Sequence, residues 1–331
     1  MSTHQTENLE PSYQSFTVRR AAGNIGAEIE GLRISGDLPQ SVIDEIEQVL
    51  LTHRVVFFRG QDHLDDRTHQ AFGARFGTTE AHPTVPSREG TRLFELDASK
   101  GGGRADSWHT DVTFKSHYPK ICILRAVTVP AYGGDTVWAN TVRAYEKLPP
   151  ELKSLAEQLW AVHSNDYDYA KDRQELDKAR LEHHKKVFIS DLYEAEHPVV
   201  HVHPVTGERA LLLGHFIKSL HNFSTTESAR LFELLQNRVT RLDNTVRWQW
   251  QQHDVAMWDN RATQHYAVND YGNQPRVVRR VTVQGGTATS IQGQTSRTRT
   301  APQFSEPGQE DTRVQAGAAA ASGRSQEPAL A

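Results

Sequence analysis

Short strand-like segments recur along most of the chain, and they limit the possible folds more than any other feature of the sequence. Some are strongly apolar throughout, such as residues 54–58 and 120–129, and others alternate apolar and polar side chains. Many short strands separated by turns are typical of β-sandwiches and barrels. The predicted strands cover residues 16–20, 54–58, 120–129, 136–138, 198–203, 210–213, 245–250, 255–258 and 276–284.

Helical patterns stand between these strands. The apolar side chains of residues 40–50 fall on one face of a helix, and residues 65–76 and 149–159 are also predicted to be helical. Ser224 and Glu227 form a capping box ahead of a further helix. The fold class we expect is mainly β, with a sandwich or barrel at the centre and helices packed on the outside.

Composition and charge exclude several classes of protein. The 331 residues carry a formal net charge of −4, with both signs mixed along the chain, so we expect no affinity for nucleic acid or anionic membranes. Cys122 is the single cysteine, which rules out an intrachain disulfide and a cysteine-based zinc site. The first 15 residues lack the apolar centre of a secretory signal, and no apolar run is long enough to span a bilayer. We therefore expect a cytoplasmic protein.

The distribution of apolar residues predicts three parts. Residues 1–15 are expected to form a loose arm, and residues 16–284 a single folded domain. Residues 285–331 contain few large apolar side chains and are expected to be disordered, because they cannot bury enough apolar area to offset the entropy of ordering. Residues 167–186 are highly charged, and we expect a mobile excursion of the kind that serves as a lid.

His109 and Asp111 form an H-x-D pair that indicates a metal site. Side chains alternate faces along an extended backbone, so these two project to the same side. An imidazole and a carboxylate can supply two ligands of the 2-His-1-carboxylate set of non-haem iron oxygenases. His265, which follows an apolar strand, is the candidate for the third ligand. An isolated H-x-D pair is more often part of a surface strand or turn, so the pair alone does not establish a metal site.

Two arginines follow the candidate third ligand. Arg276 and Arg280 are four residues apart in a predicted strand, so both point to one face at a separation of roughly 13 Å. Guanidinium groups bind planar or tetrahedral anions through paired hydrogen bonds, so this face suits two anions. The alternative is a pair of surface arginines with ordinary ion-pair partners.

These motifs resemble the TauD/TfdA family of Fe(II)- and 2-oxoglutarate-dependent dioxygenases over about residues 16–283. The resemblance is carried by W-H-T-D-V-T-F, G-G-D-T and W-D-N-R, at residues 108–114, 133–136 and 258–261. It implies a double-stranded β-helix (jelly roll) in which Fe(II) is bound by His109, Asp111 and His265. It also implies that Thr136 and Arg276 hold the distal carboxylate of 2-oxoglutarate, that O2 is the second co-substrate, and that the protein is a homo-oligomer, dimer or tetramer.

The resemblance extends to the substrate, a small organosulfur molecule. Arg280, His82 and the backbone N–H of Val112 resemble the groups that grip the sulfo group of sulfonate and sulfate substrates. Taurine-oxidising members carry Asn and Tyr at the positions of Ala105 and Val85. A buried ammonium group would lose hydrogen bonds here, at a cost of roughly 1–3 kcal/mol. An alkyl chain would instead gain about 0.8 kcal/mol per buried CH2.

We therefore expect oxidative cleavage of medium-chain alkyl sulfates to an aldehyde and sulfate, with succinate and CO2 as co-products. Residues 121–169 and 259–283 also resemble the alkylsulfatase-type members of the family. Oxidation of taurine or another alkanesulfonate is the alternative within the family. Outside it, a zinc hydrolase could use the same ligands, and a non-catalytic jelly-roll binding protein is the third interpretation.

Other residues have simpler interpretations. His201 and His203 are a rival same-face pair of histidines, with Glu196 nearby, but the pair lacks an anion-binding arginine of its own and is bracketed by Pro198 and Pro204. Trp248 and Trp250 are interpreted as packing in the core or at a subunit interface. Asp259 and Asn260 are expected either to orient the metal ligands or simply to cap a turn; the sequence leaves both open.

Overall fold

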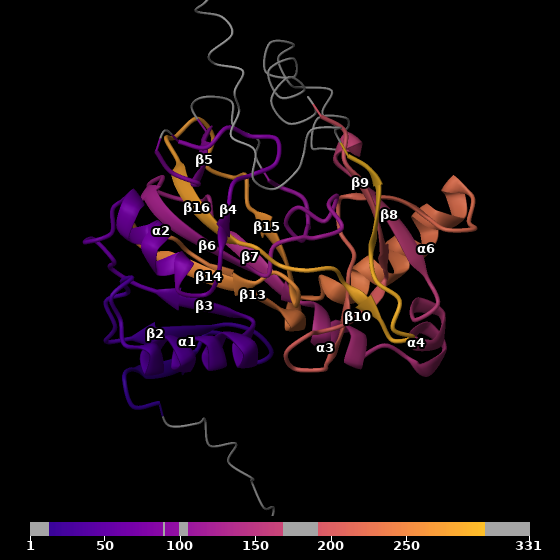
Figure 1. Ribbon diagram of the computed structural model, residues 1–331, viewed down its shortest axis with the longest axis horizontal. Helices are drawn as coiled ribbons and strands as arrows, with labels where there is room; N and C mark the ends of the chain where they lie inside the picture. Colours follow the sequence, from indigo (N-terminus) through magenta and orange to yellow (C-terminus); the bar gives the residue numbers. More distant parts are fainter. Residues whose placement is uncertain (1–12, 89, 99–104, 168–190, 302–331) are drawn as a thin grey trace, which may run out of the picture.

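The computed structural model describes residues 13–88, 90–98, 105–167 and 191–301, and its largest element is an eight-stranded sheet (Figure 1). The strands run in the order β1-β2-β3-β14-β6-β16-β4, with β5 also paired to β16, and all pairs are antiparallel except β2–β3. They are β1 (Thr17–Arg20), β2 (Ala27–Glu30), β3 (Val55–Phe58), β14 (Val255–Asp259), β6 (Ile121–Thr128), β16 (Val277–Val283), β4 (Thr79–Glu80) and β5 (Phe94–Asp97).

The two faces of this sheet are covered differently. Helices α1 (Gln40–His53) and α2 (Asp66–Ala74) lie on one face, where their apolar side chains pack against Ile121 and Ile123 of β6. Cys122 and Leu124 point to the opposite face, as the alternation along a strand requires. That face packs against a small sheet of β13 (Thr245–Trp248), β7 (Thr136–Asn140) and β15 (Thr263–Ala267).

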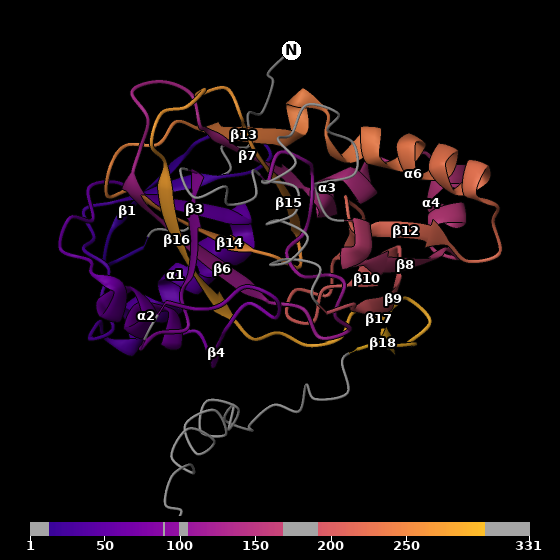
Figure 2. The same cartoon turned by 90° about the horizontal axis from the view of Figure 1, so that it is seen from above.

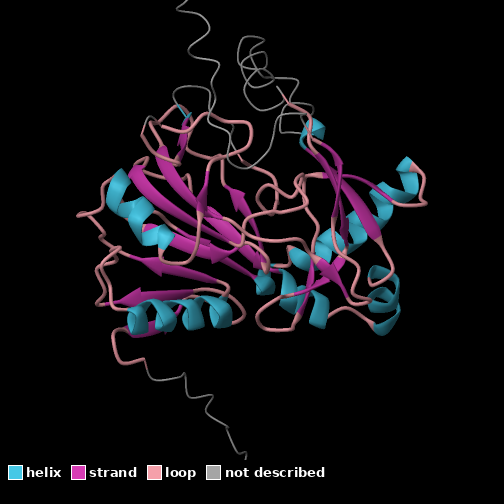
Figure 3. Cartoon of the chain, viewed as in Figure 1, coloured by secondary structure: helices cyan, strands magenta, loops and turns pink. Residues whose placement is uncertain are grey.

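A second group of strands and helices completes the protein (Figures 2 and 3). Its strands form two small sheets, in the orders β12-β8-β9-β18 and β11-β10-β17. The strands are β12 (Ile217–Leu220), β8 (Trp160–Ser164), β9 (Glu194–Pro198), β18 (Arg297–Thr300), β11 (Arg209–Leu211), β10 (Val200–Val202) and β17 (Thr289–Ser290). The helical segments are α3 (Thr141–Glu146), α4 (Pro150–Ala156), α6 (Thr225–Val239), η2 (Asn165–Tyr167) and η3 (Leu242–Asn244). Within the described residues, no helix combines the length and apolarity needed to cross a membrane.

The predicted fold class is confirmed, and so are most of its elements. Helix α6 begins with the predicted capping box, in which Ser224 and Glu227 satisfy each other's backbone N–H groups. Trp248 and Trp250 are buried, and Trp248 stacks on Phe57 with ring centroids 4.0 Å apart. The predicted excursion at residues 167–186 lies, apart from its first residue, outside the described residues.

The prediction of disorder from Gly285 onward is wrong for residues 285–301. These residues form β17, which pairs with β10, and β18, which pairs with β9. Their backbone groups are satisfied by partner strands and Ile291 packs against a core cluster, so few apolar side chains suffice to order them. The predicted loose arm also needs correction at its end, because the backbone N–H groups of Gln14 and Ser15 donate to the Glu45 carboxylate.

Ser296 is expected to anchor this C-terminal segment. Its hydroxyl lies 2.7 Å from Nδ1 of the fully buried His197, whose Nε2–H donates to the Thr113 carbonyl. We predict that Ser296→Ala lowers the free energy of unfolding in urea by about 1–3 kcal/mol, because Nδ1 of His197 is left buried without a donor. Thr300→Ala, at an exposed position of β18, is the control and should change stability by less than about 0.5 kcal/mol. Equal effects of the two would contradict the anchor.

Candidate active site

One pocket brings together all of the residues that the sequence singled out as ligands or binding groups. It opens between the main sheet and the small sheet. Its lining includes His82, His109, Asp111, Val112, Thr136, His265, Arg276 and Arg280. His82 comes from the loop after β4, and His109, Asp111 and Val112 come from the segment that precedes β6. Thr136 lies in β7 and His265 in β15. Arg280 lies in β16, and Arg276 is the residue just before that strand. The tertiary fold therefore brings all of these residues to one pocket.

His109, Asp111 and His265 form a metal-binding group. Nε2 of His109 and Nε2 of His265 lie 3.7 Å and 3.8 Å from the two carboxylate oxygens of Asp111. The three potential ligand atoms all lie within 4.8 Å of one another, and the residues are buried. A pair of backbone hydrogen bonds, 3.0 Å and 2.8 Å long, joins His109 to His265 and fixes the two histidines side by side.

Each of these three side chains has the charge state that a metal ligand needs, and His109 also has its tautomer fixed. The Nδ1–H of His109 donates to the Ser107 carbonyl at 2.8 Å, which leaves the lone pair of Nε2 for a metal. Burial lowers the pKa of both histidines, so both are neutral. Burial alone would raise the pKa of Asp111, but the Arg280 guanidinium outweighs it and holds that pKa well below its usual value. The carboxylate is therefore ionised.

Asn260 fixes the backbone of the carboxylate ligand. Its side-chain oxygen accepts from the N–H of Asp111 at 3.0 Å, and its amide group donates to the carbonyls of Asp111 and Pro119. Asp259 instead pairs with His203 and Arg261. Of the two predicted roles, the one that orients a metal ligand therefore applies to Asn260.

Val112 has an unusual backbone conformation beside the metal group. Its φ of 60° lies in the left-handed region, which is rare for a β-branched residue. Two buried histidines hold the next residue: His197 Nε2 contacts the Thr113 carbonyl at 2.7 Å, and His163 Nδ1 contacts the Thr113 hydroxyl at 2.9 Å. These contacts oppose relaxation of the turn. Neither histidine could be linked to this turn from the sequence, because both come from strands far along the chain.

Arg276 and Arg280 point into the pocket from one side of β16, as predicted, and both are buried. The Arg276 Nε–H donates to the Gly134 carbonyl at 3.2 Å. A Cβ at Gly134 would lie 3.2 Å from the Arg276 side chain, so a glycine at this position lets the guanidinium approach the β7 turn. Arg280 contacts the Asp111 carboxylate and lies over the Phe94 ring.

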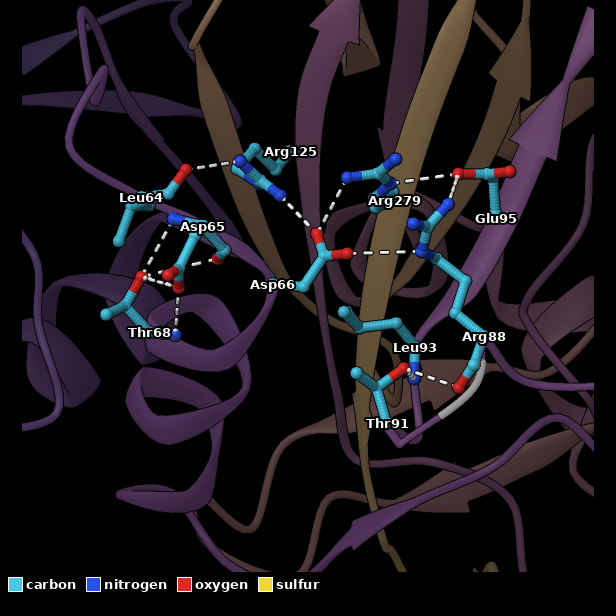
Figure 4. Close-up of polar contacts among 10 residues, drawn as sticks. All are labelled: Leu64, Asp65, Asp66, Thr68, Arg88, Thr91, Leu93, Glu95, Arg125 and Arg279. Carbon is cyan, nitrogen blue, oxygen red and sulfur yellow. Dashed lines mark hydrogen bonds and ion pairs between the residues drawn. The ribbon is translucent and has the colours of Figure 1, made fainter.

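Arg279 points the opposite way, as the alternation along a strand predicts. Figure 4 shows its guanidinium among Asp66, Glu95 and Arg88 on the helix-covered side of the sheet. The alternative predicted for Arg276 and Arg280 was a pair of ordinary surface ion pairs. Arg279, not these two arginines, makes such ion pairs. Arg276 and Arg280 belong to the pocket.

His82 presents a donor to the same pocket. Nδ1 accepts from the backbone N–H of Val85 at 3.2 Å and of Thr84 at 3.3 Å, which places the ring proton on Nε2. Burial, reinforced by Arg280, lowers the pKa of His82 to about 3, so the ring is neutral. Its ring stacks on Phe94, with centroids 4.8 Å apart.

Two further findings concern the predicted substrate region. Ala105 lines the pocket as expected, but from the loop after β4 the lining residues are His82 and Thr84 rather than Val85. Most of the remaining lining is apolar and was not predicted as part of the site. It includes Phe94, Leu96, Phe114, Leu124, Phe216 and Val278.

The rival histidine pair is not a metal site. Nε2 of His201 contacts the Arg261 carbonyl at 2.9 Å, and Nε2 of His203 contacts the Asp259 carboxylate at 2.9 Å. Within the described part of the chain, the group of three metal-binding side chains is His109, Asp111 and His265.

Comparison with known proteins agrees with this site. The family described as "Taurine catabolism dioxygenase TauD, TfdA family" matches residues 17–282. The chain belongs to this TauD/TfdA family. As a TauD/TfdA member it is an alpha-ketoglutarate-dependent dioxygenase, with 2-oxoglutarate (alpha-ketoglutarate) and O2 as co-substrates.

Two relatives are similar over nearly their whole length. An alpha-ketoglutarate-dependent sulfate ester dioxygenase of Pseudomonas putida is 56% identical over 289 residues, which cover 87% of this chain and 96% of that one. An alkylsulfatase of Acinetobacter baylyi is 56% identical over 286 residues, covering 86% and 90%. Among solved structures, a taurine dioxygenase from Burkholderia xenovorans superposes with a TM-score of 0.73 at 35% identity, covering 87% of this chain and 96% of its own. The jelly-roll fold predicted from the sequence is confirmed.

Proposed function

We propose that this protein is an Fe(II)-dependent dioxygenase that oxidatively cleaves alkyl sulfate esters. The products would be an aldehyde, sulfate, succinate and CO2. The observation that carries this proposal is a single pocket that joins a buried His-Asp-His group to two buried arginines and an apolar wall. The two relatives at 56% identity, one described as a sulfate ester dioxygenase and one as an alkylsulfatase, support the substrate class.

The donor set of the metal group fits Fe(II). Two neutral imidazoles and one carboxylate on one side of an ion leave coordination positions open for 2-oxoglutarate and O2. Oδ2 of Asp111 is buried and has no hydrogen-bond partner among the described residues, as expected of an oxygen that awaits a cation. When bound, iron and 2-oxoglutarate would supply the oxidising power that inserts one oxygen atom of O2 into a C–H bond of the substrate.

Arg276 and Thr136 would bind the distal carboxylate of 2-oxoglutarate. Arg276 is 7% exposed, and the one hydrogen-bond partner of its guanidinium among the described residues is a carbonyl. A buried cation without a carboxylate partner requires an anion for stability. The Thr136 hydroxyl, which lines the same pocket, would add a hydrogen bond to that anion.

Arg280, the Nε2–H of His82 and the backbone N–H of Val112 would bind the sulfate group. All three lie in the pocket beside Asp111, and together they offer one cation and two neutral donors to a singly charged ester. The apolar wall would then receive the alkyl chain, at about 0.8 kcal/mol per buried CH2. The Ala105 side chain offers no hydrogen bond to an ammonium group, which favours an alkyl tail over taurine.

This binding mode places the carbon that bears the ester oxygen next to the metal group. Hydroxylation of that carbon gives a hydroxylated sulfate ester. Its C–O bond to sulfate then breaks as the hydroxyl loses its proton, which leaves an aldehyde and free sulfate. No nucleophilic side chain is needed, because the product fragments by itself. The protein binds, orients and excludes water.

A substrate comparison tests this proposal. With Fe(II), 2-oxoglutarate and O2, we expect hexyl sulfate to give the fastest succinate release and one sulfate per succinate, and taurine to be much slower. If taurine ran fastest, the choice of alkyl sulfate over sulfonate would be wrong. If sulfate were released equally without O2 and 2-oxoglutarate, the zinc-hydrolase alternative would replace the proposal.

The remaining expectations about the whole molecule are also proposals. We infer that residues from about position 13 to 301 form one catalytic domain, since β17 and β18 are part of its sheets. A homo-oligomeric assembly and a cytoplasmic location stay predictions from the family resemblance and from the sequence.

A further inference from the structure

Trp250 makes a hydrogen bond that core packing does not require. Its indole Nε1–H donates to the Thr136 hydroxyl oxygen at 2.9 Å, and both residues are buried, with 7% and 1% of their surfaces exposed. Three other tryptophans of the same core, Trp138, Trp248 and Trp258, have a buried Nε1 without a hydrogen-bond partner among the described residues. Burial of the indole ring therefore does not by itself bring a partner.

The chemistry of this bond fixes the direction of a proton. An indole N–H can only donate, so the Thr136 oxygen must accept. A hydroxyl carries one hydrogen, and that hydrogen cannot lie on the side where the indole N–H approaches. Within the described residues, no protein acceptor takes the Thr136 hydrogen, while Thr136 lines the pocket together with Arg276. The hydrogen is thus left available to a ligand in the pocket.

The strands hold this arrangement in place. Thr136 is the first residue of β7. It pairs with Trp248 of β13 on one side and with Ala267 of β15 on the other. Trp250 follows β13 by two residues, so it lies on the same face as Trp248 and is one step further along the strand direction. Figure 1 shows β7 between β13 and β15 in this small sheet.

We propose that Trp250 is a positioning residue for 2-oxoglutarate, because it orients the Thr136 hydroxyl so that its hydrogen donates to the distal carboxylate of the co-substrate. This inference rests on the proposed assignment of Thr136 and Arg276 to that carboxylate. Without the indole donor, the hydroxyl can rotate among its staggered positions, and the carboxylate loses part of an aligned, charge-assisted hydrogen bond.

The test is the affinity for 2-oxoglutarate, measured by calorimetric titration of the Fe(II)-loaded protein without O2. We expect Trp250→Phe to raise the dissociation constant about tenfold, as for one misdirected hydrogen bond to a charged group. Trp248→Phe is the matched control, since Trp248 ends β13 two residues before Trp250 and lies in the same core cluster, but its Nε1 has no partner among the described residues. Its dissociation constant should equal that of the unaltered protein. The KM for alkyl sulfate should change in neither variant.

A double-variant cycle separates positioning from a general loss of structure. Thr136→Val should weaken binding at least as much as Trp250→Phe, and adding Trp250→Phe to it should weaken binding no further, because the indole acts only through the hydroxyl. If Trp250→Phe destabilises the fold, 3-benzothienylalanine at position 250 keeps the ring shape and removes only the N–H.

Three outcomes would overturn the inference. Equal dissociation constants for Trp250→Phe and Trp248→Phe would overturn the role of Trp250. The proposed function would still stand, provided that Thr136→Val weakens the binding of 2-oxoglutarate. The same would follow if Trp250→Phe kept its full effect in the Thr136→Val background. Unchanged binding in Thr136→Val would overturn the inference together with the assignment of Thr136 to 2-oxoglutarate.

Discussion

Replacing His109 by alanine will abolish substrate-dependent succinate release while the protein stays folded. Nε2 of His109 lies 3.7 Å from the Asp111 carboxylate and has its lone pair directed by the Nδ1–H bond to Ser107. Loss of an outer hydrogen bond to a ligand typically weakens metal binding by about 10- to 100-fold, and loss of the ligand itself should exceed that. We therefore expect Fe(II) affinity to fall by more than about 100-fold and turnover to fall to the level without enzyme.

His201→Gln is the control for this variant. His201 is also buried, but its ring contacts the Arg261 carbonyl and not the metal group, so Fe(II) affinity should stay unchanged. Fe(II) binding is measured by calorimetry without O2, and folding by thermal unfolding. Full succinate release by a folded His109→Ala protein would contradict the metal assignment.

Arg280→Ala should raise the KM for alkyl sulfates far more than the KM for 2-oxoglutarate. Arg280 is the buried cation of the proposed sulfate site, and a hydrogen bond to a charged group is worth about 1.5–3 kcal/mol. With two such bonds to one sulfate, we expect the KM for hexyl sulfate to rise by about 100-fold or more. The KM for 2-oxoglutarate should change by less than about threefold, because Arg276 remains.

Arg279→Ala is the matched control, since it removes the neighbouring guanidinium from the other face of β16 (Figure 4). It should alter stability but neither KM. Since Arg280 also contacts Asp111, Fe(II) affinity must be measured in the Arg280→Ala protein and the assays run at saturating iron. A parallel rise of both KM values would refute the division of roles between Arg276 and Arg280.

The chemistry of the site could be predicted because its signals are local. H-x-D places an imidazole and a carboxylate on one side of an extended backbone, and Arg276 and Arg280 share a face for the same reason. Side chains alternate between the two faces of a strand, so the face that each side chain occupies follows from its position along a few neighbouring residues. The family resemblance then added His265 to His109 and Asp111 as the implied third ligand.

Residues whose role depends on distant contacts were not predictable in this way. Ser296 lies in a segment whose polar composition predicts disorder, yet the strand that follows it, β18, pairs with β9, and the Ser296 hydroxyl contacts His197. Trp250 was predicted only as packing, because nothing in its neighbourhood along the chain indicates a hydrogen bond to Thr136. Asn260 was left with two open roles until the contact with the Asp111 backbone decided between them.

The sequence by itself determined which chemical groups line the proposed active site: two imidazoles and a carboxylate that could bind a metal, two guanidinium groups that suit anions, and an alanine side chain that offers no hydrogen bond to an ammonium group. Tertiary structure decided where these groups meet. The backbone bridge between His109 and His265 brings the third ligand to the first two, and the pairing of β7 with β13 places Trp250 against Thr136. These strands lie far apart along the chain, so no connecting turn sets their register, and the packing of the whole sheets decides it.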